Sequence, residues 1–372
     1  YEIHERLVGS EMCIRDRPKA VRRVEIPKPN GKKRPLGIAS YEDKIVQMAV
    51  KKILGAIYEP RFLNCMYGFR PNRGCHEAIK EVYQRISYGK ISYIVDADIK
   101  GFFDHIDHEW MMKFLEWNIQ DKNLLWLIRK YLKAGIMEQG KFEPTEEGSA
   151  QGSAMSPMLA NIYMHHVLTL WFKLVVQREM QGECFLVNFA DDFVAGFQYK
   201  SEAERYYKEL KERMEKFGLE LESSKSRLIE FGRFAEQNRR ARGECKPETF
   251  DFLGFTFYCG RSRKGMPYIM PKTSSKKFRQ KIRDIKVWLY ANRDQPLKKL
   301  MGMLNLKLIG HYRYYGISFN GRMISNYKQQ VRELLFKVLN RRSDRKSYTR
   351  EGFIEMLKYY PLAMPKIYVS LF

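Results

Sequence analysis

Two adjacent aspartates, Asp191 and Asp192, stand between two apolar runs in the stretch Leu186–Phe197, LVNFADDFVAGF. Short apolar runs on both sides of a polar pair predict a β-hairpin with the two carboxylates at its tip. Carboxylates this close repel each other unless a cation joins them, and Mg²⁺ prefers oxygen ligands of this kind. The alternative interpretation is an ordinary turn that contains Asp, which is the commoner case for an isolated hairpin.

A third carboxylate, Asp98, lies in the run DADIKGFFD at the end of a predicted strand. It could meet the hairpin pair in one sheet, although it precedes Asp191 by 93 residues. Three carboxylates with two Mg²⁺ ions suit in-line nucleotidyl transfer. One ion lowers the pKa of the attacking 3′-hydroxyl, and the other neutralises the triphosphate and the leaving pyrophosphate. Taken alone, Asp98 would more simply cap a turn.

Three other features could serve the same chemistry. The ring of Phe103 could lie under the sugar of a nucleotide and clash with a 2′-hydroxyl, or it could pack in the core. The loop Gln151-Gly152-Ser153 could brace a templating base or nucleotide, or it could only lead into a helix. Three cations of a basic ribbon could grip a triphosphate, or they could be a solvated hairpin face; they are Arg22, Lys28 and Arg34.

The elements that must position these residues follow from periodicity and turn signals. Residues 18–40 predict two short strands around Pro29-Asn30-Gly31. A helix is expected over about 42–56, with Ile45, Met48, Ala49 and Ile53 on one face. Further helices are expected over 77–86, 107–134, 158–176 and 201–217, with strands over 91–99 and 250–257. From about Ser274 onward the pattern is helical and basic.

The 372 residues carry a net charge of +24, and that charge is concentrated in the last third of the chain. Residues 261–372 hold 26 Lys and Arg against 6 Asp and Glu, a net charge of +20. An excess of this size repels itself without a polyanion, so nucleic acid is the expected partner. The step in charge near Gly260 is the best domain boundary.

The remaining composition indicates a reduced, cytosolic protein. The six cysteines form no CxxC pair and no zinc spacing with His, and no apolar run approaches the ~20 residues of a membrane span. Residues 1–17 look foreign, because LVGSEMCIRD resembles the translation of a sequencing adapter. We expect a native N-terminus to be missing there, and we exclude the segment from fold reasoning.

Six ordered runs resemble the blocks of the group II intron-encoded reverse transcriptase/maturase family. They are RPKAVRRVEIPKPNGKKRPLGI, MYGFRPNRGCHEAI, DADIKGFFDHIDH, EEGSAQGSAMSPMLANIYMHHVL, NFADDFV and FDFLGFTF. The later runs GHYRYYGIS and LNRRSDRKSYTREGF resemble its thumb and maturase region. A single ADD would recur by chance, whereas six blocks in the family's order would not.

The resemblance implies an α+β, right-hand polymerase fold with a basic, mostly helical thumb/maturase domain. Fingers and palm are expected within residues 18–260, divided near residue 95, and the thumb/maturase domain within 261–372. The implied activity is RNA-directed DNA synthesis from dNTPs on an RNA template with a DNA primer. The implied partners include intron RNA, and no membrane is expected.

The resemblance also assigns roles by motif position. Asp98, Asp191, Asp192 and the carbonyl of Ile99 match the ligands of two Mg²⁺ ions, and Lys225 matches a lysine that protonates pyrophosphate. The nucleotide-contact positions of the family match Arg22, Lys28, Arg34, Phe103, Gln151 and Gly152. Phe189 and Ala190 match positions that contact the primer.

The chain departs from the family where FADD replaces the commoner YADD and Asn188 stands where Arg is frequent. We expect activity to survive, with altered primer contact or fidelity. A template-contacting N-terminal extension and a Cys/His-rich endonuclease module are not expected in this chain. Two alternatives stay open: a non-catalytic RNA-binding maturase, and a domesticated reverse transcriptase in phage defence. The three intact aspartates favour catalysis.

Overall fold

The computed structural model describes residues 18–27, 33–138, 141–143, 147–148, 152–244, 246–261, 265–342 and 347–372. Contacts divide the chain into two compact units, and each is described by itself. Unit 1 comprises residues 1–78 and 93–228, and unit 2 comprises residues 79–92 and 229–372. The foreign-looking leader and the predicted contact residues Lys28 and Gln151 lie outside the described residues.

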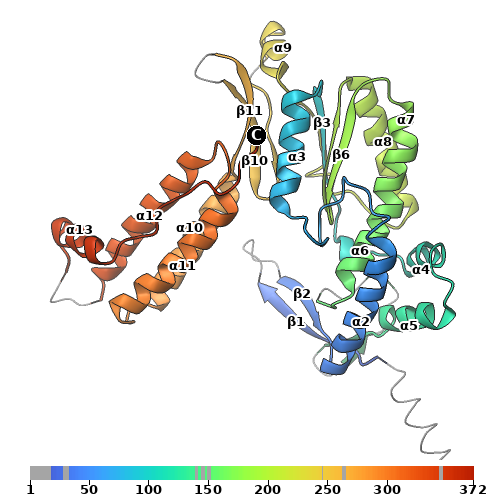
Figure 1. The fold of residues 1–372 in the computed structure, drawn as a ribbon, viewed down its shortest axis with the longest axis horizontal. Coiled ribbons are helices and arrows are strands. Elements are labelled where there is room, and N and C mark those ends of the chain that lie inside the picture. The colour runs from blue at the N-terminus through green and yellow to red at the C-terminus, as the bar shows by residue number, and fades with distance from the viewer. Residues whose placement is uncertain are drawn as a thin grey trace, which may run out of the picture. The chain divides into compact units, whose positions relative to one another are not determined.

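The central sheet has the strand order β6-β7-β3-β8 (Figure 1). Its strands are β3 (Tyr93–Asp98), β6 (Cys184–Phe189), β7 (Asp192–Phe197) and β8 (Arg227–Glu230). β7 pairs antiparallel with both β6 and β3. The predicted hairpin and the predicted strand before Asp98 are therefore confirmed, and they are direct neighbours in the sheet.

One face of this sheet is apolar and packs on helices. Val95, Ala97, Phe193, Ala195 and Phe197 alternate along β3 and β7 and belong to one buried cluster. The same cluster takes in side chains of α8 (Lys200–Lys216), α4 (His108–Glu116) and α5 (Lys122–Leu132). Figure 1 shows α8 beside the sheet. Alternation with a period of two sends the intervening residues, including Asp98 and Asp192, to the other face.

A long helical stretch, Ser156–Glu179, runs through the core of unit 1. It includes α6 (Ser156–Met164), two π-helical turns (His165–Thr169 and Phe172–Val176) and α7 (Gln177–Glu179). By length and composition it could cross a membrane, contrary to the expectation that no apolar run is long enough, but 67% of its most apolar window is buried inside the protein. The core of unit 1 therefore accounts for its apolar character.

The predicted basic ribbon is a hairpin of β1 (Val21–Pro27) and β2 (Lys33–Ile38). Its sheet has the order β2-β1-β4-β5 and includes β4 (Ile136–Glu138) and β5 (Lys141–Glu143). α2 (Tyr41–Tyr58) follows, and the Ser40 side chain caps it by accepting a hydrogen bond from the Asp43 backbone.

The apolar face expected on this helix is exposed. Ile45, Met48 and Ile53 are 56%, 44% and 47% exposed. The buried side of α2 is another stripe, formed by Asp43, Gln47, Val50, Leu54 and Tyr58. Periodicity finds an apolar stripe, whereas neighbouring elements decide which stripe is covered.

Unit 2 combines a three-stranded antiparallel sheet with helices. Its strands are β9 (Phe250–Phe252), β10 (Phe255–Arg261) and β11 (Pro267–Thr273), in the order β11-β10-β9. Its helices include α9 (Ala235–Ala241), α10 (Ser275–Ala291), α11 (Leu297–Tyr315), α12 (Gly321–Leu339) and α13 (Arg350–Tyr359). Residues 79–88 of α3 (Cys75–Tyr88) also belong to this unit.

The single strand predicted over 250–257 is wrong, because the chain turns at Leu253-Gly254 and β9 pairs with β10. Both turn residues have positive φ, 48° and 80°. The step in charge near Gly260 falls inside β10. The domain boundaries at 17, 95 and 260 stay predictions.

Candidate active site

The hairpin tip and the end of β3 bring two of the predicted carboxylates together. Phe189 on β6 lies opposite Asp192 on β7, and Ala190 and Asp191 form the two-residue connection between them. Asp192 in turn lies opposite Asp98 on β3. Residues that face each other across a sheet point to the same side. Phe189, Asp192 and Asp98 therefore form one row, with Asp191 at its side on the turn.

Like charges directly opposite each other destabilise a sheet, so this row requires a cation. In this structure the Lys225 ammonium forms an ion pair with Asp98 Oδ2. The hydrogen bond to Asp98 is the largest cause of a raised pKa of Lys225, and the charge of Asp192 raises it further. Lys225 is therefore a fully charged neighbour of the carboxylate row at neutral pH.

The backbone brings Lys225 to this place by extending the pairing beyond β3. Lys100 N donates to Glu220 O (2.9 Å), and Glu222 N donates to Asp98 O (2.8 Å). The Ser226 hydroxyl accepts a hydrogen bond from Asp98 N (3.3 Å). The chain around Lys225 is thus attached to the backbone of Asp98 itself. Ile99, the predicted carbonyl ligand, lies in the same bridge opposite Leu221.

The turn at the tip is held in an uncommon backbone conformation. Ala190 has a φ of +58°, a region that L-residues other than Asn and Asp rarely occupy. Its carbonyl accepts a hydrogen bond from the Asn188 side chain (Nδ2–O 2.7 Å). Asn188 is completely buried, so its effect on the tip is exerted through the turn. Strained residues of this kind persist where the surroundings over-determine them.

A second segment, Cys65–Gly68, supports the tip from the outer edge of β6. Asn188 N donates to Cys65 O, and Tyr67 N donates to Asn188 O, each at 2.8 Å. Gly68 follows so closely that a Cβ there would lie 2.5 Å from Ala190 N. Its carbonyl accepts a hydrogen bond from Asn161 Nδ2 (2.7 Å) on α6. Sequence reasoning missed Gly68 and Asn161; the signal was a glycine inside the quoted block MYGFRP.

Phe103 lies in a 3₁₀ turn, Phe102–Asp104, just after β3. It is partly buried against the core cluster, and its ring centroid lies 5.4 Å from that of Phe102. Both interpretations of Phe103, core packing and sugar contact, are compatible with a ring that is half in the core. Gly148 docks on this turn, since a Cβ there would lie 2.8 Å from Asp104 O.

The loop that holds Gly152 packs closely on strand β2. Gly152 has a φ of +110°, and a Cβ there would lie 2.6 Å from Gly37 O. Beside it, Gln47 Oε1 accepts hydrogen bonds from the Ser153 hydroxyl (3.0 Å) and from Ala154 N (3.1 Å). Gln47 is 3% exposed and was not singled out from the sequence. Gly152 is thus required for close approach, while Gln151 lies outside the described residues.

The structure describes only some of the residues that are predicted to bind the triphosphate. Arg22 is exposed on β1 and lies opposite Ile38 of β2. Arg34 lies opposite Ile26, and only its backbone is described. Their contact with a nucleotide stays a prediction.

The described residues contain no group of three His, Cys, Asp or Glu side chains that converge on one point. Asp98 and Asp192 nevertheless supply carboxylate oxygens on one face, and these are ligands that Mg²⁺ prefers. The Lys225 ammonium offsets one of these two negative charges through its ion pair with Asp98. The residues fit a divalent cation in donor type and charge.

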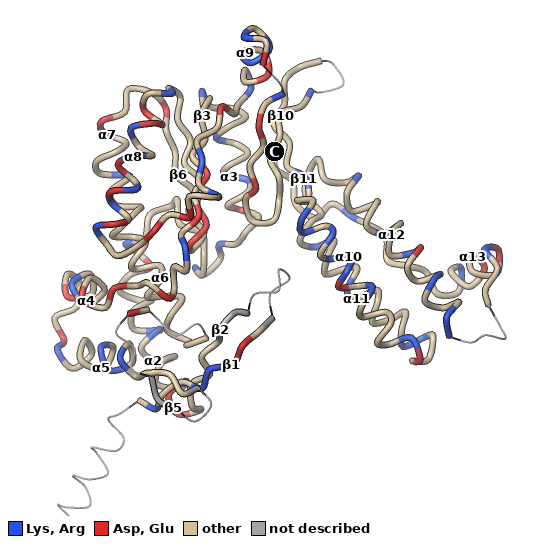
Figure 2. Tube along the Cα trace, turned by 180° about the vertical axis from the view of Figure 1, so that it is seen from behind, with Lys and Arg blue, Asp and Glu red and all other residues tan. Residues whose placement is uncertain are grey.

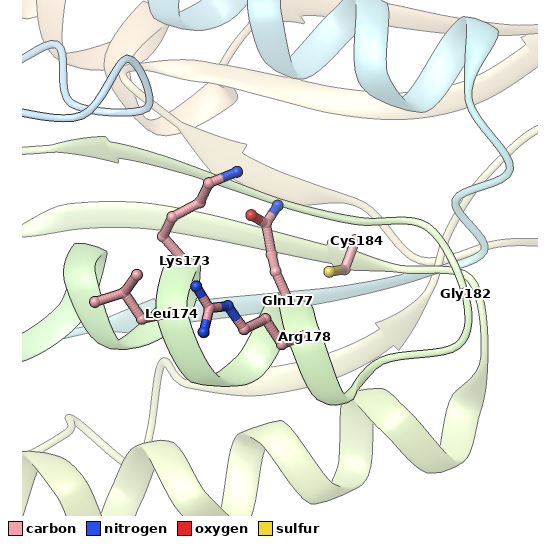
Figure 3. A pocket seen from close by; sticks show the side chains of 6 residues that line it. All are labelled: Lys173, Leu174, Gln177, Arg178, Gly182 and Cys184. Atoms are coloured by element: carbon pink, nitrogen blue, oxygen red, sulfur yellow. The ribbon is translucent and has the colours of Figure 1, made fainter.

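A cavity of about 400 Å³ lies at the other end of β6 (Figure 3). It is lined by Lys173, Leu174, Gln177, Arg178, Gly182 and Cys184. Cys184 begins β6 and the turn at Ala190-Asp191 follows Phe189, so the strand separates the two places by about 20 Å. The cavity is therefore not part of the carboxylate row.

The sequence matches the family described as reverse transcriptase (RNA-dependent DNA polymerase) over residues 26–257, which is more than half of the chain. The chain belongs to the reverse transcriptase family. Residues 275–354 match the maturase-specific domain of group II introns. The predicted membership in the group II intron reverse transcriptase/maturase family is confirmed.

Relatives support the same assignment. The chain is 44% identical over 165 residues to the group II intron-encoded protein LtrA of Lactococcus lactis, covering 44% of this chain and 27% of that protein. It is 39% identical over 151 residues to protein YkfC of Escherichia coli, covering 40% of each. The chain thus spans about a quarter and two fifths of these relatives.

Among solved structures, a telomerase from Candida albicans is similar with a TM-score of 0.50 and 12% identity. The match covers 92% of this chain and 61% of that one. At this identity the similarity concerns the fold alone. Together with the mixed helices and sheets of both units, it confirms the predicted α+β, right-hand polymerase fold.

Proposed function

We propose that this member of the reverse transcriptase family is an active RNA-directed DNA polymerase that joins dNTPs to a DNA primer on an RNA template. The observation that carries the proposal is the row of Asp98 and Asp192 across β3 and β7, with Asp191 on a braced turn beside it. A non-catalytic maturase would have no use for two facing carboxylates, which destabilise a sheet.

The carboxylates of Asp98, Asp191 and Asp192, with the carbonyl of Ile99, would hold two Mg²⁺ ions. Bound there, Mg²⁺ lowers the pKa of a primer 3′-hydroxyl and neutralises charge on the triphosphate. Lys225 is charged and adjacent to the row, so it is the donor of a proton to the leaving pyrophosphate. The chain's own contribution is to keep these groups in one fixed arrangement.

The remaining predicted residues bind the substrates. Nucleotide contact is assigned to Arg22, Lys28, Arg34, Phe103, Gln151 and Gly152. Gly152 supports this assignment because its loop is attached to the strand that carries Arg34. Phe189 extends the carboxylate row, and Ala190 belongs to the turn, so both lie where a primer end must approach.

We further propose that unit 2 assists the splicing of an intron RNA in the bacterial cytoplasm. Residues 275–354 match the maturase-specific domain, and Lys and Arg recur along α10 and α11 (Figure 2). Phosphate contacts by these cations release counterions, so affinity for the intron RNA should fall steeply with salt. A flat response to salt would contradict this role.

A primer-extension assay tests the polymerase. With an RNA template, a DNA primer, dNTPs and Mg²⁺, the wild-type chain should extend the primer, and Asp98→Asn should not. Phe103→Ala should admit ribonucleotides roughly tenfold better if its ring excludes the 2′-hydroxyl. Extension by Asp98→Asn at the wild-type rate would overturn the polymerase mechanism, and unchanged sugar selectivity in Phe103→Ala would assign that ring to the core.

A further inference from the structure

Phe69 combines exposure with an unfavourable backbone conformation. It is 51% exposed and has a φ of +57°. A single exposed apolar residue is ordinary, but a bulky residue in the left-handed region is an outlier that costs folding energy. Such residues cluster where strain serves a binding or catalytic site.

Both neighbours of Phe69 are anchored, so the strain cannot relax by moving the backbone. On one side Gly68 lies against the turn at Ala190 and accepts the hydrogen bond from Asn161. On the other side Arg70 is 9% exposed and donates to Leu63 O and Met66 O.

Arg70 also forms an ion pair with Glu59 at 2.8 Å. The arginine of the GFRP run is therefore a structural brace rather than a ligand-binding cation. Between the two anchors, the chain presents the Phe69 ring outward at the side of the catalytic turn. Within the described parts of the chain, the Phe69 ring stacks on no other ring and lies under no cation.

We propose that Phe69 is a primer-binding residue, whose ring packs against the sugar and base of the last primer nucleotides. This inference rests on the proposed polymerase function, since the turn beside Phe69 carries the carboxylates that face the primer 3′ end. Phe69, which follows Gly68 in the chain, and Ala190, which packs against Gly68, both have positive φ, 57° and 58°. Aromatic rings bind nucleotides with little dependence on sequence, as a primer site requires.

Replacement of Phe69 by glycine distinguishes an effect on primer binding from an effect on folding. Glycine adopts positive φ without steric cost, so Phe69→Gly removes the ring and keeps the backbone conformation. We expect an unchanged or raised midpoint of thermal unfolding. The KM for the primer–template should rise about tenfold, while the KM for dNTP stays the same. Phe69→Trp should restore the KM for the primer–template.

Trp117 offers a matched control, because it is an 83% exposed aromatic residue of the same unit at the end of α4. Trp117→Ala should leave the KM for the primer–template unchanged. A lowered unfolding midpoint of Phe69→Gly together with an unchanged KM would show a purely structural ring and overturn the proposal.

Binding measured without dNTPs and Mg²⁺ keeps this test independent of catalysis. Fluorescence anisotropy with a labelled RNA–DNA primer–template should show about tenfold weaker binding of Phe69→Gly, and no change for single-stranded RNA. If the wild-type protein were inactive but still bound the primer–template more tightly than Phe69→Gly does, the polymerase function would be refuted and the contact between Phe69 and the primer would stand. Equal losses for both nucleic acids would overturn the assignment to the primer.

Discussion

Two antiparallel hairpins of unit 1 carry charged residues, and they are built in opposite ways. The hairpin β6–β7 forms one edge of the central sheet, and its strands are buried except at Cys184, Phe189 and Asp192. The hairpin β1–β2 lies in a separate sheet, and Arg22, Val24 and Ile26 of its first strand are exposed. One hairpin presents carboxylates, and the other presents cations.

The difference fits the ligand that we propose for each hairpin. Carboxylates that repel one another must be fixed before a small cation can join them, so the tip at Ala190 is braced by Asn188 and by Gly68. Cations that grip a polyphosphate attract their ligand from a distance and gain from long, mobile side chains. A rigid scaffold is therefore required at one hairpin and dispensable at the other.

The largest effect is expected at the braced tip. Asp191→Asn should reduce primer extension by at least about a thousandfold, because it removes a charge that the two proposed Mg²⁺ ions require. RNA affinity should stay close to that of the wild type. Asp104→Asn, an exposed carboxylate of the same unit, is the control and should extend normally. Robust extension by Asp191→Asn would remove the hairpin from the mechanism.

The brace itself is tested by Asn188→Leu, which leaves the Ala190 carbonyl without its side-chain donor. We expect the extension rate to fall about 10- to 100-fold through misplacement of the carboxylates, with a nearly unchanged KM for dNTP. Asn320 in unit 2 is also completely buried and donates to a backbone carbonyl, that of Tyr315. Asn320→Leu should lower stability without this loss of rate; equal rates in both variants would mean that the brace is dispensable.

The exposed hairpin should respond more weakly. Arg22→Ala should raise the KM for dNTP about threefold to tenfold, and the difference should shrink at high salt, because an exposed charge is screened. Lys52→Ala removes an exposed cation of α2 and serves as the control. If Arg22→Ala lowered the extension rate as much as Asn188→Leu does, the contrast between the two hairpins would be wrong.

The smallest effect concerns two adjacent histidines, His165 and His166, in the long core helix of unit 1. Burial lowers the pKa of His165 and of His166 to about 4, and both are neutral in the folded protein. The unfolded chain takes up these protons first, near pH 6.5. The free energy of unfolding should therefore fall as the pH drops from 6.5 towards 4, by about 1.4 kcal/mol per pH unit for each histidine.

Urea unfolding at pH 7.5 and 5.5 measures this loss. His166 stacks on Phe114 with ring centroids 4.6 Å apart, so His166→Phe keeps the packing and removes one titrating group. This variant should lose about 1 kcal/mol less than the wild type between the two pH values. An identical loss in both proteins would show that His166 is not the group that titrates.

Local sequence signals predicted the elements whose pattern is strong. The apolar runs around Asp191, the two strands of the basic ribbon and the charged helix after the hairpin all formed where expected. Local sequence signals failed where the structure of a segment depended on the elements that pack against it. The run at 250–257 looks like one strand, but Leu253-Gly254 reverses it. On α2 the more apolar stripe was left exposed, and Asp43 and Gln47 were buried.

The sequence by itself determined which residues could do chemistry, because carboxylates, a basic ribbon and a polycationic last third in the order of the reverse transcriptase family predict metal, triphosphate and nucleic acid as ligands. Only the tertiary structure decided how that chemistry is held. Asp98 meets Asp192 through strand register, and Lys225 reaches Asp98 through a backbone bridge. The Asn188 side chain braces the strained turn at Ala190, and Gly68 packs against that turn from the segment 65–68, which is remote in sequence. Such contacts depend on long-range packing, and no local pattern of residues encodes them.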